Sequence, residues 1–404
     1  MNEQKKPLEG LKVVELGTHF AVPAVGRMLA DWGAEVIKVE GLKGDAWRYV
    51  GKNQLCPTVD EENPFFTVPN ANKKFLALNL KTPEGKEALT KLIGTAEIFI
   101  SNMRMPSLKK LGFDYETLSA LYPGLIYGHF TGYGYKGPDA AKPGFDSVAF
   151  WARSGAMIDW ETAGSFPFLA PTGAGDAMTG SILCAGILAA LLGKRASGKG
   201  TFVSSSLMGS SIWYNNAAVV STQYGNKFPK DKDHPANPFG WQYECADGEW
   251  LMIGVVDYAD AYRKIFHLFG RDDLVEDERF NTIGAVQQHM DEFVPILRGY
   301  FKQKRLDEWV RLIGELNIVI GKIGHLSELA TDPQAVANEF VKDVTFPSGK
   351  TVAMPTIPVE FSDYETRDVY QPTGSIGSDT AGILASIGYT EQEISDMRTN
   401  GAIL

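Results

Sequence analysis

Cysteine is scarce in this chain. Three cysteines stand in 404 residues, and none belongs to a CxxC pair or a cysteine–histidine cluster: Cys56, Cys184 and Cys245. The six histidines are scattered singly, and none has the spacing of metal ligands. These scarcities exclude a small disulfide-stabilised scaffold and argue against a zinc centre. We therefore expect reduced thiols, a reducing compartment and no metal.

Long hydrophobic runs and an excess of positive charge are also missing. The N-terminus, MNEQKKPLEG, has no apolar core and no cleavage site. The most apolar window, 177–192, is too short and too rich in Gly, Ser and Thr for a comfortable membrane span. With 39 basic and 49 acidic residues, the net charge of −10 argues against nucleic acid or an anionic membrane as a partner. We expect a cytoplasmic protein.

The pattern that is present alternates between strand and helix. Residues 11–16 (LKVVEL) and 35–39 (EVIKV) read as apolar strands, and residues 24–32 between them have helical spacing. A short crossover between two apolar strands predicts a parallel sheet covered by helices. The fold class is therefore α/β, Rossmann-like in pattern, although the first turn, GTHFAVP at 17–23, lacks a GxGxxG phosphate loop.

The alternation continues and then changes character. Further strands are predicted at 76–80, 98–101, 125–131 and 201–207, with helices at 83–93 and 106–110 and an apolar helix ending at Gly193. Length predicts two or three domains. We expect a large domain over 1–222, a linker over 223–240 that is rich in Pro and Gly, and a small α+β domain over 241–330. Residues 331–404, with two helices at the end, would return to the large domain.

Asp176 is the candidate that stands out for chemistry. It lies in PTGAGDAMTG, residues 171–180, where an apolar helix begins and flanking glycines allow a ligand to approach the backbone. Free backbone N–H groups at that helix start would lower the pKa of the carboxylate and could stabilise an oxyanion. From residue type and position alone, an ordinary helix cap is the more frequent role of such an aspartate. The reactive role stays open at this point.

Three weaker candidates surround it. The loop 132–138 (GYGYKGP) could form an aromatic lid whose Lys136 meets a phosphate, or it could be an ordinary surface loop. His19 lies in the first strand–helix turn, and His129 lies inside a predicted strand. A set of basic residues at strand ends would together suit a polyphosphate: Lys38, Arg48, Lys73, Lys74, Arg104, Lys109, Lys110, Lys136 and Lys142. No GxSxG motif is present and no cysteine lies beside a plausible base, which disfavours a serine or cysteine nucleophile. No GKS or GKT sequence follows the loop 132–138, so it is not a P-loop.

Several motifs, in order along the whole chain, resemble the family III CoA-transferases. They are LEGLKVVEL at 8–16, GAEVIKVE at 33–40, NKK at 72–74, LNLKTPEG at 78–85, TGYG at 131–134, Gly175-Asp176 and GYTEQEI at 388–394. The resemblance implies a large Rossmann-like CoA-binding domain built from both chain ends, with a small domain inserted, in an interlocked ring-like homodimer. It also implies that Asp176 is the nucleophile, that acyl-CoA and a carboxylic acid are the substrates, and that no cofactor is permanently bound.

The resemblance also implies CoA contacts. They map onto Phe20, Ala21, Leu78, Asn79, Leu80, Lys81, Asn102, Met103, Arg104 and Lys110, and we add Lys142 from the basic set. Two departures matter. Gly41 stands where the formyl-CoA branch has an arginine. The segment 237–240 (NPFG) replaces that branch's long glycine run, so the active-site lid must differ.

The choice of substrate rests on the same resemblance. Related 2-methylacyl-CoA racemases carry a Gly-His-Asp motif, but here the motif is Gly144-Phe145-Asp146, so two-base proton exchange is disfavoured. The stretches 69–74, 144–150 and 237–239 are most similar to the branch that moves CoA onto (R)-2-hydroxy acids in amino-acid fermentation. We favour 2-hydroxyisocaproate, the leucine-derived acid, over phenyllactate. A CoA-binding scaffold without catalysis is a further alternative, which the retained Asp176 disfavours.

Overall fold

The chain divides into two compact units. The computed structural model describes residues 6–56, 58, 62–366 and 370–404. The first unit contains residues 1–155, 169–219 and 333–404, and the second contains 156–168 and 220–332. Residues 156–168 thus belong to the second unit, whereas the sequence places them inside the large domain. Each unit is taken in turn.

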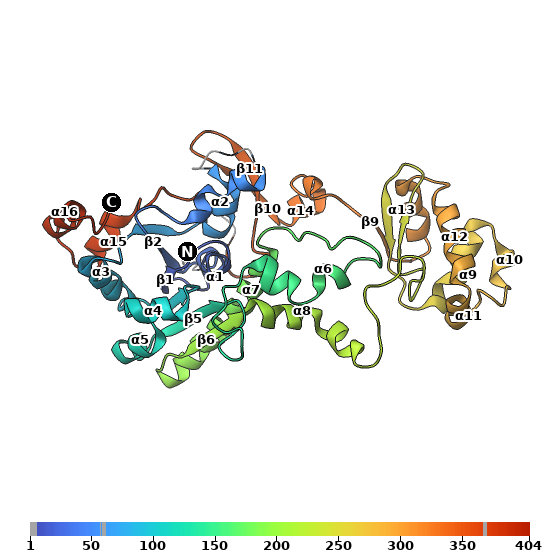
Figure 1. Cartoon of the computed structure of the whole chain (residues 1–404). Helices are drawn as coiled ribbons and strands as arrows, with labels where there is room; N and C mark the ends of the chain where they lie inside the picture. Colours follow the sequence, from blue (N-terminus) through green and yellow to red (C-terminus); the bar gives the residue numbers. More distant parts are fainter. Residues whose placement is uncertain (1–5, 57, 59–61, 367–369) are drawn as a thin grey trace. The chain divides into compact units, whose positions relative to one another are not determined.

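A six-stranded parallel sheet forms the centre of the first unit (Figure 1), with the strand order β3-β2-β1-β4-β5-β6. This is the doubly wound Rossmann order, so the predicted fold class is confirmed. The chain reverses its direction of winding between β1 and β4. The strands are β1 (Lys12–Leu16), β2 (Glu35–Glu40), β3 (Lys74–Ala77), β4 (Ile98–Ser101), β5 (Ile126–Thr131) and β6 (Phe202–Ser206).

Helices cover this sheet on both faces, which explains why most residues of its central strands are apolar and buried, although Glu15 of β1 and Lys38 of β2 are buried charged residues. Val14 of β1, for example, is fully buried and lies in register with Ile37 and Phe99 of the neighbouring strands. The helical segments up to the end of β6 are α1 (Ala21–Asp31), η1 (Ala46–Tyr49), η2 (Gly51–Gln54), α2 (Pro64–Asn70), α3 (Pro83–Ile93), α4 (Met105–Leu111), α5 (Tyr115–Leu121), the π-helical η4 (Asp146–Ala152) and α7 (Ala174–Ser197). After β6 comes α8 (Leu207–Thr222), whose residues to Val219 belong to this unit.

The apolar helix α7 is longer than the sequence suggests. Gly193 does not end it; the helix continues to Ser197 and stops at Gly198, whose φ of 71° is left-handed. Gly180 brings α7 close to α1, because only 3.4 Å would separate a Cβ there from the Ala21 carbonyl oxygen. Among the described residues, α7 alone is long and apolar enough to be a candidate membrane span, with a mean hydropathy of 1.6.

The C-terminal segment completes the same unit. Figure 1 shows α15 (Thr380–Ser386) and α16 (Glu391–Thr399) beside α3, and their apolar residues share one hydrophobic core with it. A capping box opens α16, because Thr390 and Glu393 exchange side-chain and backbone hydrogen bonds. The sequence missed α14 (Pro333–Ala337) and the antiparallel hairpin of β10 (Val341–Thr345) and β11 (Thr351–Pro355), since Pro and Gly spacing hid the alternation.

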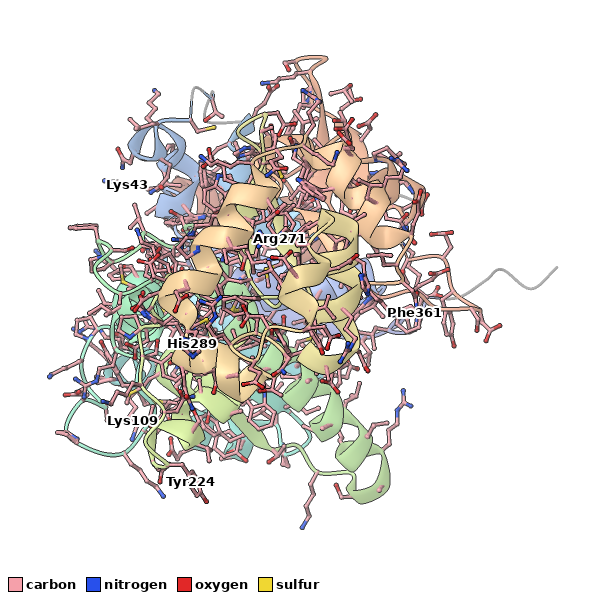
Figure 2. All side chains as sticks on the ribbon, turned by 90° about the vertical axis from the view of Figure 1, so that its right-hand side faces the viewer. Lys43, Lys109, Tyr224, Arg271, His289 and Phe361 are labelled. Carbon is pink, nitrogen blue, oxygen red and sulfur yellow. The ribbon has the colours of Figure 1, made fainter. Side chains whose placement is uncertain are left out.

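The second unit has its own sheet and aromatic core. Its antiparallel strands are β7 (Gln242–Glu244), β8 (Trp250–Ile253) and β9 (Ile320–Lys322). Its helical segments are α6 (Ala156–Asp159), α9 (Tyr258–Phe269), α10 (Asp272–Val275), α11 (Ile283–Gln288), α12 (Met290–Phe301), α13 (Leu306–Gly314) and η5 (Leu326–Glu328). Arg271 and His289, labelled in Figure 2, precede α10 and α12. Phe239 of the NPFG segment is fully buried in this core, stacked on Tyr258.

Candidate active site

A cavity of about 610 Å³ opens in the first unit, at the carboxyl ends of β1, β4 and β5. It therefore lies beside the point where the strand order reverses, which is where ligands bind in open α/β sheets. The lining comes from the β1–α1 turn, the β4–α4 connection, the end of β5 with its glycine-rich loop, residues 140–145, and the starts of α7 and α8. The residues are Thr18, His19, Ala21, Asn102, Met103, Arg104, Met105, Pro106, Ser107, His129, Phe130, Thr131, Gly132, Gly134, Tyr135, Ala140, Ala141, Lys142, Pro143, Gly144, Phe145, Asp176 and Leu207.

Two neighbouring strand ends are tied together at this cavity. The backbone N–H of Thr18 donates to Asn102 Oδ1 at 3.0 Å, and Asn102 Nδ2 donates to the Thr18 carbonyl oxygen at 2.8 Å. This reciprocal pair links the β1–α1 turn to the end of β4. The His19 ring lies near Trp47 and Phe145, with centroid distances of 5.4 and 5.7 Å.

Asp176 lies in the first turn of α7, half-buried at the cavity wall. The two nearby glycines are required by close packing. Gly173 has a left-handed φ of 81°, and a Cβ on it would lie 2.9 Å from the Phe20 ring. A Cβ on Gly175 would lie 2.3 Å from Asp146 Oδ1. Gly175 therefore allows a second carboxylate, Asp146, to reach the start of the helix.

Asp146, the first residue of the π-helical η4, takes the backbone donors of that helix start. The Gly173 N–H donates to Asp146 Oδ2 at 2.9 Å. Burial raises the pKa of Asp146 to about 6, although the N–H groups of Gly173, Gly175 and Asp176 oppose the rise. π-Helical turns are frequent at functional sites. The sequence shows Asp146 only as the last residue of the Gly144-Phe145-Asp146 motif, and no local pattern predicts its place beside Asp176.

The pKa of Asp176 is raised, which corrects the expectation that helix N–H groups lower it. Burial is the largest cause, the negative charge of Asp146 adds to it, and together they bring the pKa to about 8. The expected donors serve Asp146 instead. Two carboxylates thus meet at one helix start, and both hold their protons more tightly than a carboxylate in water.

The glycine-rich loop after β5 is fastened to the cavity floor. The Tyr135 hydroxyl hydrogen-bonds His129 Nδ1, and His129 Nε2 lies 2.8 Å from the Met103 carbonyl oxygen. Because Nε2 must donate to that carbonyl, Nδ1 accepts from the tyrosine. Burial lowers the pKa of His129, which favours this neutral form. Lys136 is not among the lining residues, so its suggested phosphate contact has no support from the cavity.

Six of the predicted site residues line the cavity together: Asp176, Ala21, Asn102, Met103, Arg104 and Lys142. The other six do not. Phe20 packs on Gly173, Lys110 is exposed on the last turn of α4, and Lys81 is exposed. Leu78 and Leu80 belong to the hydrophobic core or pack on it, and Asn79 donates to the Gly401 carbonyl oxygen at 3.0 Å. Their CoA contacts stay predictions.

The basic set suggested for a polyphosphate does not form one surface. Lys38, Lys73 and Arg48 are buried, because carboxylates on neighbouring elements neutralise them: Lys38 and Lys73 pair with Glu15, and Arg48 pairs with Glu40 at 2.8 Å. Of the nine, only Arg104 and Lys142 line the cavity. Gly41, singled out from the sequence, has open space around it.

Three or more metal-ligating side chains do not gather anywhere in the described part of the chain. The site instead combines a carboxylate, Asp176, with a cavity large enough for part of an extended ligand.

Comparison with known proteins gives the family. A family model described as CoA-transferase family III matches residues 8–380. The chain belongs to this family. An (R)-2-hydroxy-4-methylpentanoate CoA-transferase of Clostridioides difficile is 38% identical over 396 residues, covering 98% of this chain and 99% of that protein. A cinnamoyl-CoA:phenyllactate CoA-transferase of Clostridium sporogenes is 35% identical, covering 100% and 99%.

The fold agrees with solved structures of the family. The crystal structure of a CAIB/BAIF family protein from Brucella suis matches with a TM-score of 0.82 and 29% identity. The match covers 95% of this chain and all of that one. This protein is therefore an enzyme, a family III CoA-transferase, and CoA thioesters are its substrates.

Proposed function

We propose that this enzyme moves CoA from an acyl-CoA donor onto (R)-2-hydroxy-4-methylpentanoate, which is 2-hydroxyisocaproate. The observation that carries the proposal is the similarity to the Clostridioides difficile enzyme along nearly the whole length of both chains. The place in metabolism that follows is the fermentation of leucine, in the cytoplasm.

Asp176 acts as the nucleophile in this proposal. Its carboxylate attacks the thioester carbonyl of the donor, the C–S bond breaks, and CoA leaves as the thiolate. The product on the enzyme is a mixed anhydride between Asp176 and the donor acid. The thiolate then attacks the aspartyl carbonyl, which gives an aspartyl-CoA thioester and frees the donor carboxylate.

The second half runs the same steps in reverse. The carboxylate of the acceptor attacks the aspartyl-CoA thioester and releases the CoA thiolate. That thiolate attacks the acceptor's carbonyl in the new anhydride, which forms the acceptor's CoA thioester and regenerates the Asp176 carboxylate. The thioester energy is kept in covalent form throughout, provided that water stays out.

The cavity supports this assignment of roles. Asp176 lines it together with two basic side chains, Arg104 and Lys142, although Lys142 also pairs with Asp139 at 2.6 Å. Cations at the wall suit the phosphates of CoA. Thr18, Ala21 and Asn102 line the same cavity from the strand ends.

Phenyllactate is the second candidate acceptor, because the Clostridium sporogenes enzyme is 35% identical over the whole chain. The two acids differ in an isobutyl against a benzyl side chain. An apolar pocket separates such groups by only about 1–3 kcal/mol.

We also propose a homodimer in which two copies interlock. Large apolar side chains remain exposed on the single chain, and a second copy would cover them. Trp213 is 71% exposed, Leu169 85% and Phe166 91%. Tyr224, 89% exposed, points away from the ribbon in Figure 2. Sedimentation of the full chain should give the mass of a dimer, and a monomer would contradict this part of the proposal.

A CoA-transfer assay read by mass spectrometry tests the proposal. Isocaproyl-CoA or acetyl-CoA is supplied with 2-hydroxyisocaproate, phenyllactate, oxalate, carnitine or succinate. We expect 2-hydroxyisocaproyl-CoA to form fastest. A preference for phenyllactate would keep the mechanism and move the acceptor, whereas no transfer to any 2-hydroxy acid would contradict the substrate class.

A further inference from the structure

His19 adopts a backbone conformation that its side chain disfavours. Its φ is 65°, in the left-handed region, where a Cβ crowds the backbone and glycine is the usual residue. His19 nevertheless lines the cavity, together with Thr18 and Ala21 on either side of it. The turn therefore needs contacts that hold it in this conformation, and two buried side chains, Asp45 and Lys38, supply them.

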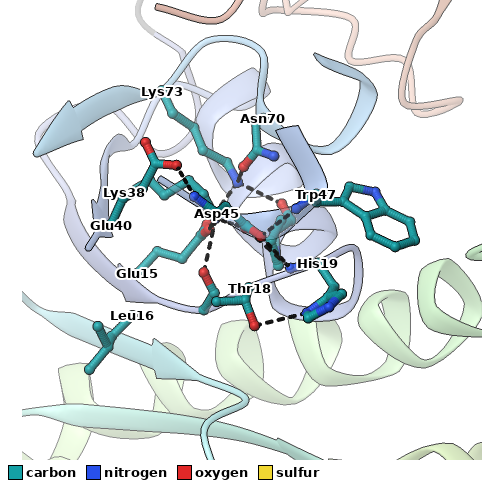
Figure 3. A network of polar contacts seen from close by, with 12 residues as sticks. Glu15, Leu16, Thr18, His19, Lys38, Glu40, Asp45, Trp47, Asn70 and Lys73 are labelled. Carbon is teal, nitrogen blue, oxygen red and sulfur yellow. Dashed lines mark hydrogen bonds and ion pairs between the residues drawn. The ribbon is translucent and has the colours of Figure 1, made fainter. Parts of the chain in front are cut away.

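Asp45 supplies the first contact. Both of its carboxylate oxygens accept the backbone N–H of His19, at 3.1 and 3.2 Å, and Oδ1 also accepts the N–H of Trp47 at 3.0 Å (Figure 3). The side chain is almost fully buried. Burial alone would raise its pKa, but the charge of Lys38 and the two N–H groups outweigh burial, and the pKa is lowered. Asp45 is thus a stable anion that contacts the backbone of the turn.

Lys38 supplies the second contact. Its ammonium is completely buried and has three acceptors for its three protons: Asp45 Oδ2 at 3.0 Å, Glu15 Oε1 at 3.1 Å and the Gly17 carbonyl oxygen at 2.9 Å. Figure 3 shows these side chains converging next to Thr18 and His19. The Lys38–Asp45 pair therefore hydrogen-bonds the backbone on both sides of Thr18. Lys38 donates to the carbonyl oxygen of Gly17, and Asp45 accepts the N–H of His19.

We propose that Asp45, with Lys38, is a positioning residue for CoA transfer: it holds the β1–α1 turn in its left-handed form, so that His19 and the start of α1 present the acyl-CoA binding surface beside Asp176. The inference rests on the proposed role of the cavity as the acyl-CoA site. Neither side chain lines the cavity, so neither touches substrate.

A purely structural role makes a different prediction, and the chain offers a matched control. Asp31 is equally buried, forms an ion pair with Arg27 at 2.7 Å and also belongs to a hydrogen-bonded cluster, with Asn72 at 2.8 Å. It lies on the last turn of α1, at the opposite end from His19. Replacing either aspartate removes a buried charge, but only Asp45 holds the turn.

The experiment compares Asp45→Asn with Asp31→Asn in the full-length enzyme, measuring kcat and the KM values of acetyl-CoA and the acceptor acid separately. A charge-assisted hydrogen bond is worth a tenfold effect or more, so we expect the acetyl-CoA KM to rise about tenfold in Asp45→Asn, with a smaller change in kcat. In Asp31→Asn we expect a lower melting temperature with an unchanged KM. An unchanged KM in Asp45→Asn, or an equal rise in both variants, would overturn the inference.

A double variant separates the turn from general stability. Glycine adopts positive φ without strain, so in a His19→Gly background Asp45→Asn should raise the KM only about twofold. If Asp45→Asn alone does not fold, the double variant is compared with His19→Gly. Additive effects, or failure of both Asp45 variants to fold, would assign Asp45 a purely structural role. If the unmodified enzyme transfers no CoA, the proposed function fails and the positioning role with it; if it does transfer CoA, only the positioning role is at stake.

Discussion

Asp45 and Asp176 are aspartates of the same unit with opposite environments. Asp45 is buried against the Lys38 ammonium at 3.0 Å, and its pKa is lowered. Asp176 is half-buried beside another carboxylate, Asp146, and its pKa is raised to about 8. One negative charge is compensated where it lies, whereas the other is opposed by burial and by a like charge.

The difference separates structure from reactivity. A compensated anion gains nothing by reacting, because its charge is already stabilised by a partner. A buried carboxylate anion without such a partner has a higher free energy. Forming the anhydride removes its negative charge and so relieves this cost. A buried acidic group in this fold is therefore a candidate for catalysis when no cation pairs with it. When a cation does pair with it, the group instead stabilises the conformation of the neighbouring backbone.

The largest expected effect is on the uncompensated side. We expect Asp176→Asn to lower kcat about a thousandfold or more, because the amide cannot form the anhydride. Its raised pKa means that the folded state binds the proton better than the unfolded chain, so stability falls as pH rises through about 8. The variant should therefore melt at a higher temperature than the wild type under alkaline conditions. A melting temperature that falls would contradict the comparison.

The compensated side should respond in stability. We expect Lys38→Met to lower the free energy of unfolding by about 3–5 kcal/mol, because it leaves Glu15 and Asp45 buried with one cation fewer. Urea unfolding measures the loss. Lys74→Met, which removes an exposed partner of Glu35 at 2.5 Å, is the matched control and should cost about 1 kcal/mol or less. Equal losses in the free energy of unfolding of Lys38→Met and Lys74→Met would contradict the stabilising role of the buried Lys38.

The pH dependence of transfer tests the like-charge pair. The negative charge of Asp146 disfavours the Asp176 anion, so its removal in Asp146→Asn should lower the pKa of Asp176. The acidic limb of kcat/KM, which we expect near pH 8 in the wild type, should move down by about one unit. Asp114→Asn, at the N-cap of α5, serves as control and should leave the limb in place. A limb that moves upward would contradict the assignment.

The smallest effect is expected at the loop. Tyr135→Phe removes the hydrogen bond to His129 and leaves the ring, so the loop should be held less firmly. A neutral hydrogen bond contributes about 1 kcal/mol, which corresponds to a rise of about fivefold in the acyl-CoA KM. Tyr133→Phe, in the same loop but outside the cavity lining, should keep the wild-type KM. An equal rise of the KM in both variants would contradict the role of the Tyr135–His129 hydrogen bond in holding the loop.

Periodicity predicted the parallel sheet because short, mainly apolar segments alternate with segments of helical spacing. It could not separate Lys38 and Lys73 from surface lysines, since their acceptors come from residues far along the chain. The same holds for Asp146 and Asp176, which are 30 positions apart and come together where Gly175 has no side chain to exclude Asp146. Contacts of this kind are properties of the fold and leave no local pattern.

The most direct test of Asp176 as the nucleophile is a search for covalent CoA on this residue. The enzyme is incubated with acetyl-CoA without acceptor, digested, and the peptide that contains Asp176 is analysed by mass spectrometry. We expect this peptide to carry CoA in thioester linkage, hydroxylamine to remove it, and Asp176→Asn to carry none. An unmodified peptide in an enzyme that transfers CoA, with transfer preserved in Asp176→Asn, would contradict this role.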